Sequence, residues 1–291
     1  MVLEMNDIKV IKTGGGIVEN PMLLEQFIKD FSALDGPKIL VHGGGVMASQ
    51  LQRQLGQQPV MIDGRRVTDM DTLKVVTMVY AGWCSKSITA LLQKNGCNAI
   101  GLSGADADLI RATRRPPVRK EGQTEGETVT IDYGYVGDVD PLRINARFLC
   151  RLIDAGITPV ICAITYDGNG SLLNTNADTI ASSVAVSLAS YIKGGIRSES
   201  LSSGKPAELP EVSLIYCFEK DGVLYDRDDD SSVIPEITPE RYSRLKQEGR
   251  VAAGMIPKLD NAFNALENGV KQVIIKNARN IGNSIGTVIS L

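Results

Sequence analysis

The feature that most constrains the fold is a unit that occurs twice near the start of the sequence, in which a short apolar run ends in glycines and leads into a helical pattern. Residues 8–11 precede glycines 14–16, and residues 38–41 precede glycines 43–45. The first triplet is soon followed by an Asn-Pro pair, a combination that begins helices. A repeated order of strand, glycine turn and helix predicts an open, mainly parallel sheet with helices on both faces.

The same alternation continues to the end of the chain. It predicts a three-layer α/β/α sandwich with an open, mainly parallel central sheet. The predicted helix over residues 68–95 counts Trp83 among its apolar residues. Further strands are predicted at residues 97–102, 158–164, 212–218, 272–276 and 286–291, and further helices at 46–55, 141–156, from 177, from 239 and at 257–268.

Three other segments complete the pattern. Residues 111–127 contain paired arginines and prolines and predict an exposed loop or hairpin, and residues 129–135 alternate as a half-exposed antiparallel strand does. Residues 193–210 are rich in Gly, Ser, Glu and Lys, which is typical of a linker. We therefore predict two halves, residues 1–189 and 190–291.

Composition excludes several classes of function. Lys and Arg total 31 against 34 for Asp and Glu, so the formal charge of -3 provides no positive field that would attract nucleic acid or an anionic membrane. The single histidine, His42, excludes metal sites built from several histidines. The five cysteines never form a CxxC pair, as in proteins of a reducing compartment. With no secretory signal and no run of about 18 apolar residues, we expect a cytoplasmic protein.

The two glycine triplets are candidate anion sites, because ligands of open α/β sheets bind beyond the carboxyl ends of the strands. Glycines let the backbone approach a phosphate closely, and helix N-termini direct free N–H groups toward it. The alternative is that the glycines only make tight strand-to-helix turns. Neither triplet belongs to a P-loop or to a G-x-G-x-x-G motif, so both of these nucleotide-binding motifs are absent.

A few polar residues near the predicted turns are candidates for binding or catalysis. Lys12 lies two residues before the first triplet, where a lysine would reach a phosphate, although strand-end lysines are more often surface residues. Lys258 begins a predicted helix, where a cation opposes the helix dipole. Arg65 and Arg66 are either surface charge or a clamp for a carboxylate. Residues 174–178 surround a predicted helix start, and both helix capping and a carboxylate aimed at the glycines remain open.

Five short motifs, in this order, resemble those of the N-acetylglutamate kinases in the amino acid kinase family. They are IKTGG at residues 11–15, VHGGG at 41–45, GRRVT at 64–68, LNTNAD at 173–178 and GMIPK at 254–258. A closing GTVI extends the resemblance over residues 8–290. Each motif alone is weak evidence, whereas five in order are specific.

The resemblance implies a role for each matching residue. Lys12 and Lys258 would neutralise charge on the transferring phosphoryl group, and Asp178 would hold both lysines in place. Where the family commonly has an aspartate in its nucleotide motif, this chain reads FEKDG. The other implied residues are Gly44, Gly45, Arg66 and Asn174 for the substrate, Gly14, Gly15 and Gly43 for phosphate, and Glu219, Asp221 and Gly222 for the nucleotide.

The implied reaction transfers the γ-phosphoryl group of ATP, with Mg²⁺, to the γ-carboxylate of N-acetyl-L-glutamate or N-succinyl-L-glutamate in arginine biosynthesis. The first half would bind the acylglutamate and form a dimer, and the second would bind the nucleotide. Phosphoryl transfer depends mainly on positioning and electrostatic stabilisation. A carboxylate nucleophile needs no histidine base, so His42 is expected to be structural. We expect no protein metal site and no nucleic-acid or membrane partner.

Three alternatives stay open at this point. A kinase for aspartate, glutamate or carbamate is the nearest, and the GRRVT motif with Asn174 argues against it. A nicotinamide-dependent oxidoreductase would need a dinucleotide motif, and a binding or sensor protein would have lost one of the lysines. Arginine-inhibited hexameric relatives carry an extended N-terminal helix that this sequence does not show before its first strand. We therefore expect a homodimer without arginine feedback.

Overall fold

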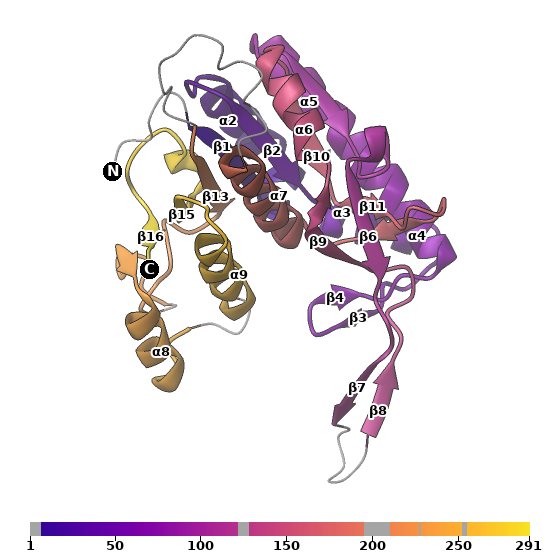
Figure 1. Cartoon of the computed structure of the whole chain (residues 1–291). Coiled ribbons are helices and arrows are strands. Elements are labelled where there is room, and N and C mark those ends of the chain that lie inside the picture. The colour runs from indigo at the N-terminus through magenta and orange to yellow at the C-terminus, as the bar shows by residue number, and fades with distance from the viewer. Residues whose placement is uncertain (1–6, 122–127, 195–209, 227, 252–254) are drawn as a thin grey trace.

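The computed structural model describes residues 7–121, 128–194, 210–226, 228–251 and 255–291. Its centre is an eight-stranded sheet in the order β14-β16-β15-β13-β1-β2-β10-β5, in which only β15 and β16 pair antiparallel (Figure 1). The predicted open, mainly parallel sheet is therefore confirmed. Its strands are β1 Ile8–Thr13, β2 Lys38–His42, β5 Ala99–Leu102, β10 Thr158–Cys162, β13 Val212–Phe218, β14 Glu236–Ile237, β15 Gln272–Asn277 and β16 Thr287–Ile289.

The sheet is continuous across the two predicted halves of the chain. β1 pairs with β2 on one side and with β13 on the other, in parallel. The strands at the centre are buried almost throughout, because parallel strands are covered by helices on both faces. Most of the predicted linker, residues 195–209, lies outside the described residues.

Helices pack against the sheet in two groups. In the first, α7 packs on α6 and α9 and contacts β1, β2 and β13; in the second, α2 packs on α5, which contacts β5 and β10. Figure 1 shows α7 lying over the strands. The helices are α1 Gly15–Glu19, α2 Pro21–Ser32, α3 Gly45–Gln54, α4 Met70–Thr77, α5 Ser85–Lys94, α6 Ala146–Asp154, α7 Ala177–Lys193, α8 Pro239–Gln247 and α9 Ile256–Glu267.

A smaller sheet and two hairpins lie beside the first half. The sheet has the order β12-β11-β6-β9, and the β7–β8 hairpin projects away from the body of the molecule (Figure 1). The hairpin is thus confirmed over the exposed loop, with residues 122–127 outside the described residues. The antiparallel strand predicted at residues 129–135 is confirmed only as far as Ile131, where β8 ends. The strands are β3 Met61–Ile62, β4 Arg65–Arg66, β6 Ile110–Arg114, β7 Val118–Glu121, β8 Thr128–Ile131, β9 Gly137–Ile144, β11 Ile164–Tyr166 and β12 Leu172–Asn174.

The prediction that a helix begins at Pro141 is wrong. Pro141 lies in β9, an edge strand whose pairing with β6 is irregular between Ile110 and Ala112. Proline has no N–H to donate, so it is tolerated at an edge where that bond is not needed. The helix begins instead at Ala146, because the side chain of Asn145 accepts a hydrogen bond from the N–H of Phe148 and caps it.

Two other predicted elements are divided in the structure. The strand predicted at residues 158–164 separates into β10 and β11, so the chain passes there from the central sheet to the smaller one. The helix predicted over 68–95 consists of α4, a π-helix at Met78–Cys84 and α5. Trp83, one of the apolar residues of the predicted helix, is 67% exposed.

Among the described residues, one helical segment, Met70–Lys94, could cross a membrane by length and composition alone. In the structure this segment packs on α2, β5 and β10, and Val76, Ile88 and Leu92 are fully buried. Core helices of globular proteins pass the same test, so the feature is weak evidence for a membrane span.

Candidate active site

One buried carboxylate joins two lysines at the carboxyl ends of the central strands. Lys12 Nζ lies 2.7 Å from Asp178 Oδ1, and Lys258 Nζ lies 2.8 Å from Asp178 Oδ2. The three side chains are 12%, 23% and 15% exposed for Lys12, Lys258 and Asp178, respectively. The structure therefore brings together the three residues that the sequence assigned to catalysis.

The three groups come from segments that are far apart in the sequence. Lys12 is near the end of β1, Asp178 is in the first turn of α7, and Lys258 is in the first turn of α9. Asn176 caps α7 by accepting hydrogen bonds from the N–H groups of Asp178 and Thr179. Asn176 therefore caps the helix, and the carboxylate of Asp178 is available to bind the two lysines.

The charge of this triad favours an anion nearby. Burial raises the pKa of Asp178, but the ammonium groups of Lys12 and Lys258 outweigh burial and lower it to about 2. Two cations and one carboxylate leave one net positive charge. The cation of Lys258 also lies at a helix start, which is unfavourable for a cation and favourable for an anion.

The two glycine turns are connected by Glu19, a residue that the sequence analysis missed. Glu19 ends α1, and its Oε1 accepts hydrogen bonds from the N–H groups of Val46 at 3.1 Å and Met47 at 3.3 Å. Gly44 stands at the N-cap position of α3 and has no side chain to cap the helix, so Glu19 supplies the cap from the neighbouring turn. Burial raises the pKa of Glu19, and the two N–H donors oppose this.

The glycines assigned to phosphate differ in what their backbones can offer. The N–H of Gly14 donates to the carbonyl oxygen of Cys217 at 2.9 Å and so continues the strand pairing. Gly15 begins α1 and faces a cavity that it shares with Gly43. Gly14 is therefore placed to shape the turn, whereas Gly15 and Gly43 line open space.

Arg66 is buried and held by the start of α3. Its Nη2 donates to the carbonyl oxygen of Gly45 and to Ser49 Oγ, both at 2.7 Å, and its Nη1 donates to Gln52 Oε1. These contacts engage three of its five N–H donors. The sequence analysis missed Ser49 and Gln52. These two residues are three positions apart on α3 and therefore lie on the same face of the helix.

Two adjoining cavities join these groups into one site. The first, about 400 Å³, is lined by Arg66, Asn174 and the glycines at 43–45, and the second, about 360 Å³, includes Lys12 and Gly15. Arg66 and the second glycine turn line both cavities. Asn174 is buried, and its Nδ2 donates to Thr68 Oγ1 at 3.0 Å.

Further charged residues line the first cavity, and the sequence did not single out two of them. Arg115 and Asp138 form an ion pair there, beside Arg65 and Arg66. Burial lowers the pKa of Arg65, as does the charge of Arg115. The cavity thus has three guanidinium groups and one carboxylate on its walls.

The residues assigned to the nucleotide do not gather as a group. Glu219 reaches the first glycine turn, because a Cβ on Gly16 would clash with its Oε1. Asp221 instead accepts a hydrogen bond from Asn280 Nδ2 at 3.0 Å, and Gly222 is buried against Thr287. Of these three residues, only Glu219 lies beside the glycine turn that the sequence analysis assigned to phosphate.

His42 and the cysteines are unsuited to proton transfer or nucleophilic attack in this structure. His42 is fully buried, its Nδ1 is 2.8 Å from the carbonyl oxygen of Gly43, and burial lowers its pKa to about 4. The imidazole is therefore neutral, as expected for a structural histidine. Burial raises the pKa of Cys84 to about 11 and that of Cys217 to about 12, which leaves both as thiols at neutral pH.

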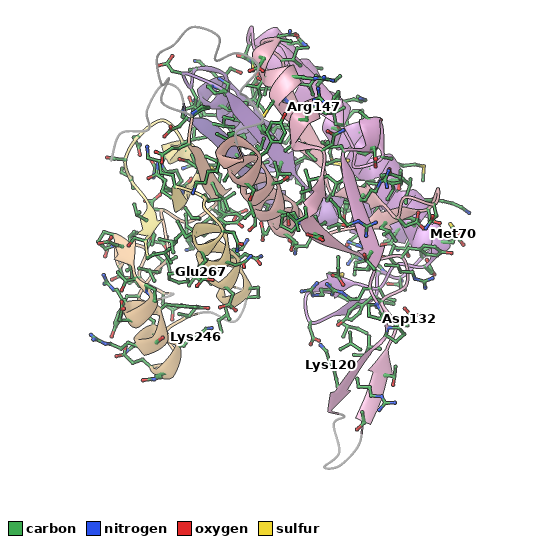
Figure 2. All side chains as sticks on the ribbon, in the orientation of Figure 1. Met70, Lys120, Asp132, Arg147, Lys246 and Glu267 are labelled. Atoms are coloured by element: carbon green, nitrogen blue, oxygen red, sulfur yellow. The ribbon has the colours of Figure 1, made fainter. Side chains whose placement is uncertain are left out.

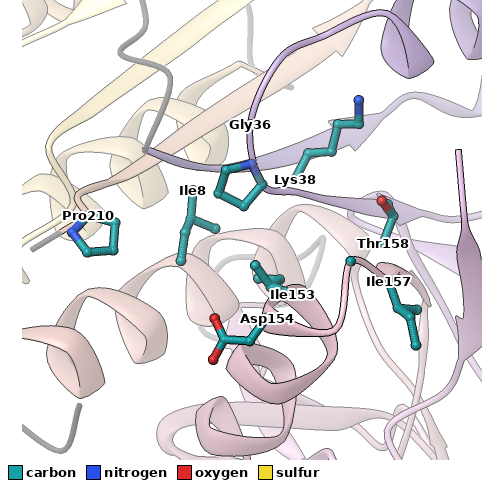
Figure 3. Close-up of a pocket in the computed structure, with 10 residues that line it drawn as sticks. Ile8, Gly36, Lys38, Ile153, Asp154, Ile157, Thr158 and Pro210 are labelled. Atoms are coloured by element: carbon teal, nitrogen blue, oxygen red, sulfur yellow. The ribbon is translucent and has the colours of Figure 1, made fainter. Parts of the chain in front are cut away.

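A larger cavity, about 510 Å³, lies at the opposite ends of the strands. Its walls include Ile8, Lys38 and Thr158, the first residues of β1, β2 and β10 (Figure 3). The ammonium group of Lys38 donates to the carbonyl oxygens of Ser32 and Leu34. Ligands of open α/β sheets bind at the carboxyl ends, so the glycine-lined cavities are the better candidate.

The described residues contain no group of three or more His, Cys, Asp or Glu side chains that could hold a metal ion. The polar groups of the candidate site are instead lysines, arginines and backbone amides. Such groups bind anionic oxygens.

Known proteins are similar to this chain over nearly its whole length. The family model described as the amino acid kinase family matches residues 7–190 and 207–277. A protein called acetylglutamate kinase from Phocaeicola vulgatus is 49% identical over 96% of this chain and 97% of its own. Another of that name from Cytophaga hutchinsonii is 47% identical over 95% of this chain and 94% of its own.

A solved structure shares the fold at lower identity. N-acetylglutamate synthase from Neisseria gonorrhoeae, complexed with coenzyme A and N-acetyl-glutamate, matches with a TM-score of 0.73 and 22% identity. The match covers 99% of this chain and 60% of that one.

The Asp178 triad predicts how stability depends on pH. Because the pKa of Asp178 is about 2 in the folded protein, against an ordinary value of 3.8, its charge stabilises the fold above about pH 4, and this contribution is lost as the pH falls toward 2. We expect the difference in unfolding free energy between the wild type and Asp178→Asn to shrink by about 2 kcal/mol between pH 5 and pH 2. Urea unfolding at each pH measures it.

Asp71→Asn is the matched control, because Asp71 pairs with Lys74 on the exposed face of α4. Its difference from the wild type should stay within about 0.5 kcal/mol at every pH. A constant difference for Asp178→Asn would contradict the interpretation.

Proposed function

The chain belongs to the amino acid kinase family, and we propose that it transfers the γ-phosphoryl group of ATP to the side-chain carboxylate of N-acetyl-L-glutamate, in arginine biosynthesis. The observation that carries the proposal is the Lys12–Asp178–Lys258 triad beside a cavity that contains Arg66. The products are ADP and an acyl phosphate.

Each of the two cavities would bind one end of the substrate. Arg66 and Asn174 would bind the α-carboxylate and the amide of the acylglutamate in the first cavity. Its γ-carboxylate would then extend past Gly44 and Gly45 into the second, toward Lys12. Holding both reactants in line removes much of the entropic cost of the encounter.

The chemical step needs charge stabilisation and no proton transfer. An oxygen of the γ-carboxylate forms a bond to the γ-phosphorus, and the bond from that phosphorus to the bridging oxygen of ADP breaks. Lys12 and Lys258 would neutralise the charge that spreads over the phosphoryl oxygens, while Asp178 keeps both ammonium groups in place. Backbone N–H groups of Gly15 and the second glycine turn would add hydrogen bonds.

Mg²⁺ would be held mainly by the phosphate oxygens of ATP and by water. Oxygen ligands suit this ion, and the carboxylate of Glu219 is an oxygen donor beside the first glycine turn. Bound with ATP, the ion neutralises charge on the phosphates. We assign the acylglutamate to residues 1–189 and the nucleotide to residues 190–291, since Lys258 and Glu219 belong to the second half.

N-succinyl-L-glutamate is a second candidate substrate, and a specific observation favours it. The first cavity has the guanidinium groups of Arg65, Arg66 and Arg115 against the single carboxylate of Asp138. This surplus of positive charge suits an acyl group that ends in a carboxylate. An acetyl group would leave it without a partner on the substrate.

We further propose a homodimer in the cytoplasm. Three large apolar side chains, Met70, Met78 and Trp83, are 46%, 55% and 67% exposed along one helical segment. Figure 2 shows Met70 at the outer edge of the molecule. An exposed apolar strip of this kind suits association with a second copy. All five cysteines are buried and none of them forms a disulfide in the described structure, which fits a reducing compartment.

The function is tested with purified protein and MgATP. We expect ADP release that depends on an N-acyl-L-glutamate, with the acyl phosphate trapped by hydroxylamine. N-acetyl-L-glutamate and N-succinyl-L-glutamate are compared side by side, and unacylated L-glutamate is the control that should give no turnover. ATP hydrolysis that no N-acyl-glutamate stimulates would overturn the proposal.

Lys258→Arg tests the triad within that assay. Arginine keeps the charge but spreads it over a planar fork that no longer fits between Asp178 and the phosphoryl group. We expect kcat to fall about 10²-fold or more, with a smaller change in the KM for the acylglutamate. Lys246→Arg is the matched control on α8, where Lys246 is exposed and pairs with Asp260 (Figure 2). Equal activities for the two variants would show that Lys258 has no such role.

The dimer is tested by sedimentation. The wild type should have about twice the chain mass of 31.3 kDa. Replacing both Met78 and Trp83 with lysine should give monomers, because the charges cannot be buried between copies. Leu142→Lys, at a residue 87% exposed on β9, should leave the mass unchanged. A wild-type monomer would contradict the proposal.

A further inference from the structure

The long helix keeps one face buried through its π-helical middle. Val76, Tyr80, Cys84, Ile88 and Leu92 are spaced four residues apart, and all are buried. In an α-helix of 3.6 residues per turn, positions four apart drift round the axis by about 40° at each step. The wider turn of the π-helix offsets this drift, so the middle of the helix stays turned toward α3. Such π-helical turns occur often at functional sites.

This geometry presses Tyr80 against the second glycine turn. A Cβ on Gly44 would lie 3.0 Å from Tyr80 Cδ1 and 3.0 Å from Cys84 Sγ. A Cβ on Gly45 would lie 3.9 Å from the Tyr80 hydroxyl oxygen. A side chain at Gly44 would therefore press against the ring of Tyr80 and the sulfur of Cys84. The ring of Tyr80 thus packs against the second glycine turn and supports it.

The hydroxyl end of Tyr80 lies beside Gly45, the residue whose carbonyl oxygen accepts a hydrogen bond from Arg66. Tyr80 lines the first cavity together with Arg66 and Asn174. Burial raises the pKa of Tyr80, and the guanidinium of Arg66, which interacts with the hydroxyl, opposes this. Arg66 Nη2 also donates to the carbonyl oxygen of Gly45. The turn, Arg66 and Tyr80 therefore form one contiguous contact group.

We propose that Tyr80 is a positioning residue for the acylglutamate, whose ring supports the Gly44–Gly45 turn and whose hydroxyl fixes the direction of the Arg66 guanidinium. The inference rests on the proposed function, because it assigns Arg66 to the substrate carboxylate. Through Tyr80, the group that binds the carboxylate and the turn that faces the phosphoryl group would share one support.

Tyr80→Phe removes the hydroxyl and keeps the ring. We expect the KM for the acylglutamate to rise about three- to tenfold, with kcat and the KM for ATP within about twofold of the wild type. Tyr80→Leu also removes the wall behind Gly44, so kcat should fall as well. Comparing the wild type with Tyr80→Phe gives the effect of the hydroxyl, and comparing Tyr80→Phe with Tyr80→Leu gives the effect of the ring. Steady-state kinetics with each substrate varied, alongside the melting temperature, gives every value.

Val79→Ala is the control for a purely structural role. Val79 is buried in the same π-helix and does not line either cavity of the site. It should lower the melting temperature and leave both KM values unchanged. If Tyr80→Phe behaves in the same way, or raises both KM values equally, the inference is wrong. A wild-type protein that no acylglutamate stimulates rejects the proposed function itself, and that is measured first.

Discussion

The arrangement of the site depends on one buried carboxylate between two ammonium groups. Asp178 is charged in an environment that disfavours charge, and Lys12 and Lys258 provide the compensation. Neither lysine is stabilised by its own segment, since one ends a buried strand and the other begins a helix. Removing the carboxylate would leave two nearby cations in a partly dry site, which is costly. The same ion pairs tie β1 to α9 and so connect the two halves of the chain around α7.

In the proposed reaction, backbone N–H groups of the glycine turns bind the anionic oxygens beside the Asp178 triad. Side chains must therefore hold these turns in place without covering them. Gly44 cannot cap α3, so its first N–H groups would lack partners if Glu19 did not accept from two of them. Arg66 in turn uses Gly45, Ser49 and Gln52 to fix its orientation. The start of α3 is thereby held from two sides, by Glu19 and by Arg66. The second glycine turn packs closely against its neighbours. A side chain at Gly44 would press against the ring of Tyr80, so this position suits glycine.

The sequence was informative where chemistry is local and less so where packing decides. Strand ends, glycine turns and a cap at Asn176 follow from short patterns, and motif order brought Lys12, Lys258 and Asp178 together correctly. Glu19 and Tyr80 carry no local signal, since each acts across a contact that only the folded chain makes. Pro141 was misleading, because proline begins helices but also suits an irregular edge strand. The four-residue spacing from Val76 to Leu92 was visible, yet its meaning depends on the π-helix.

The scarcity of histidine follows from the same chemistry. In the proposed reaction the nucleophile is a carboxylate that is ionised at neutral pH, and ADP leaves as an anion, so no proton has to move in the transfer. Groups of fixed charge and backbone dipoles are then sufficient, and they need no group that titrates near pH 7. The one histidine is buried and neutral beside the second glycine turn, with its pKa lowered to about 4. Asp178, with its pKa lowered to about 2, is ionised at neutral pH. The positive charge of the triad therefore does not depend on a titrating imidazole.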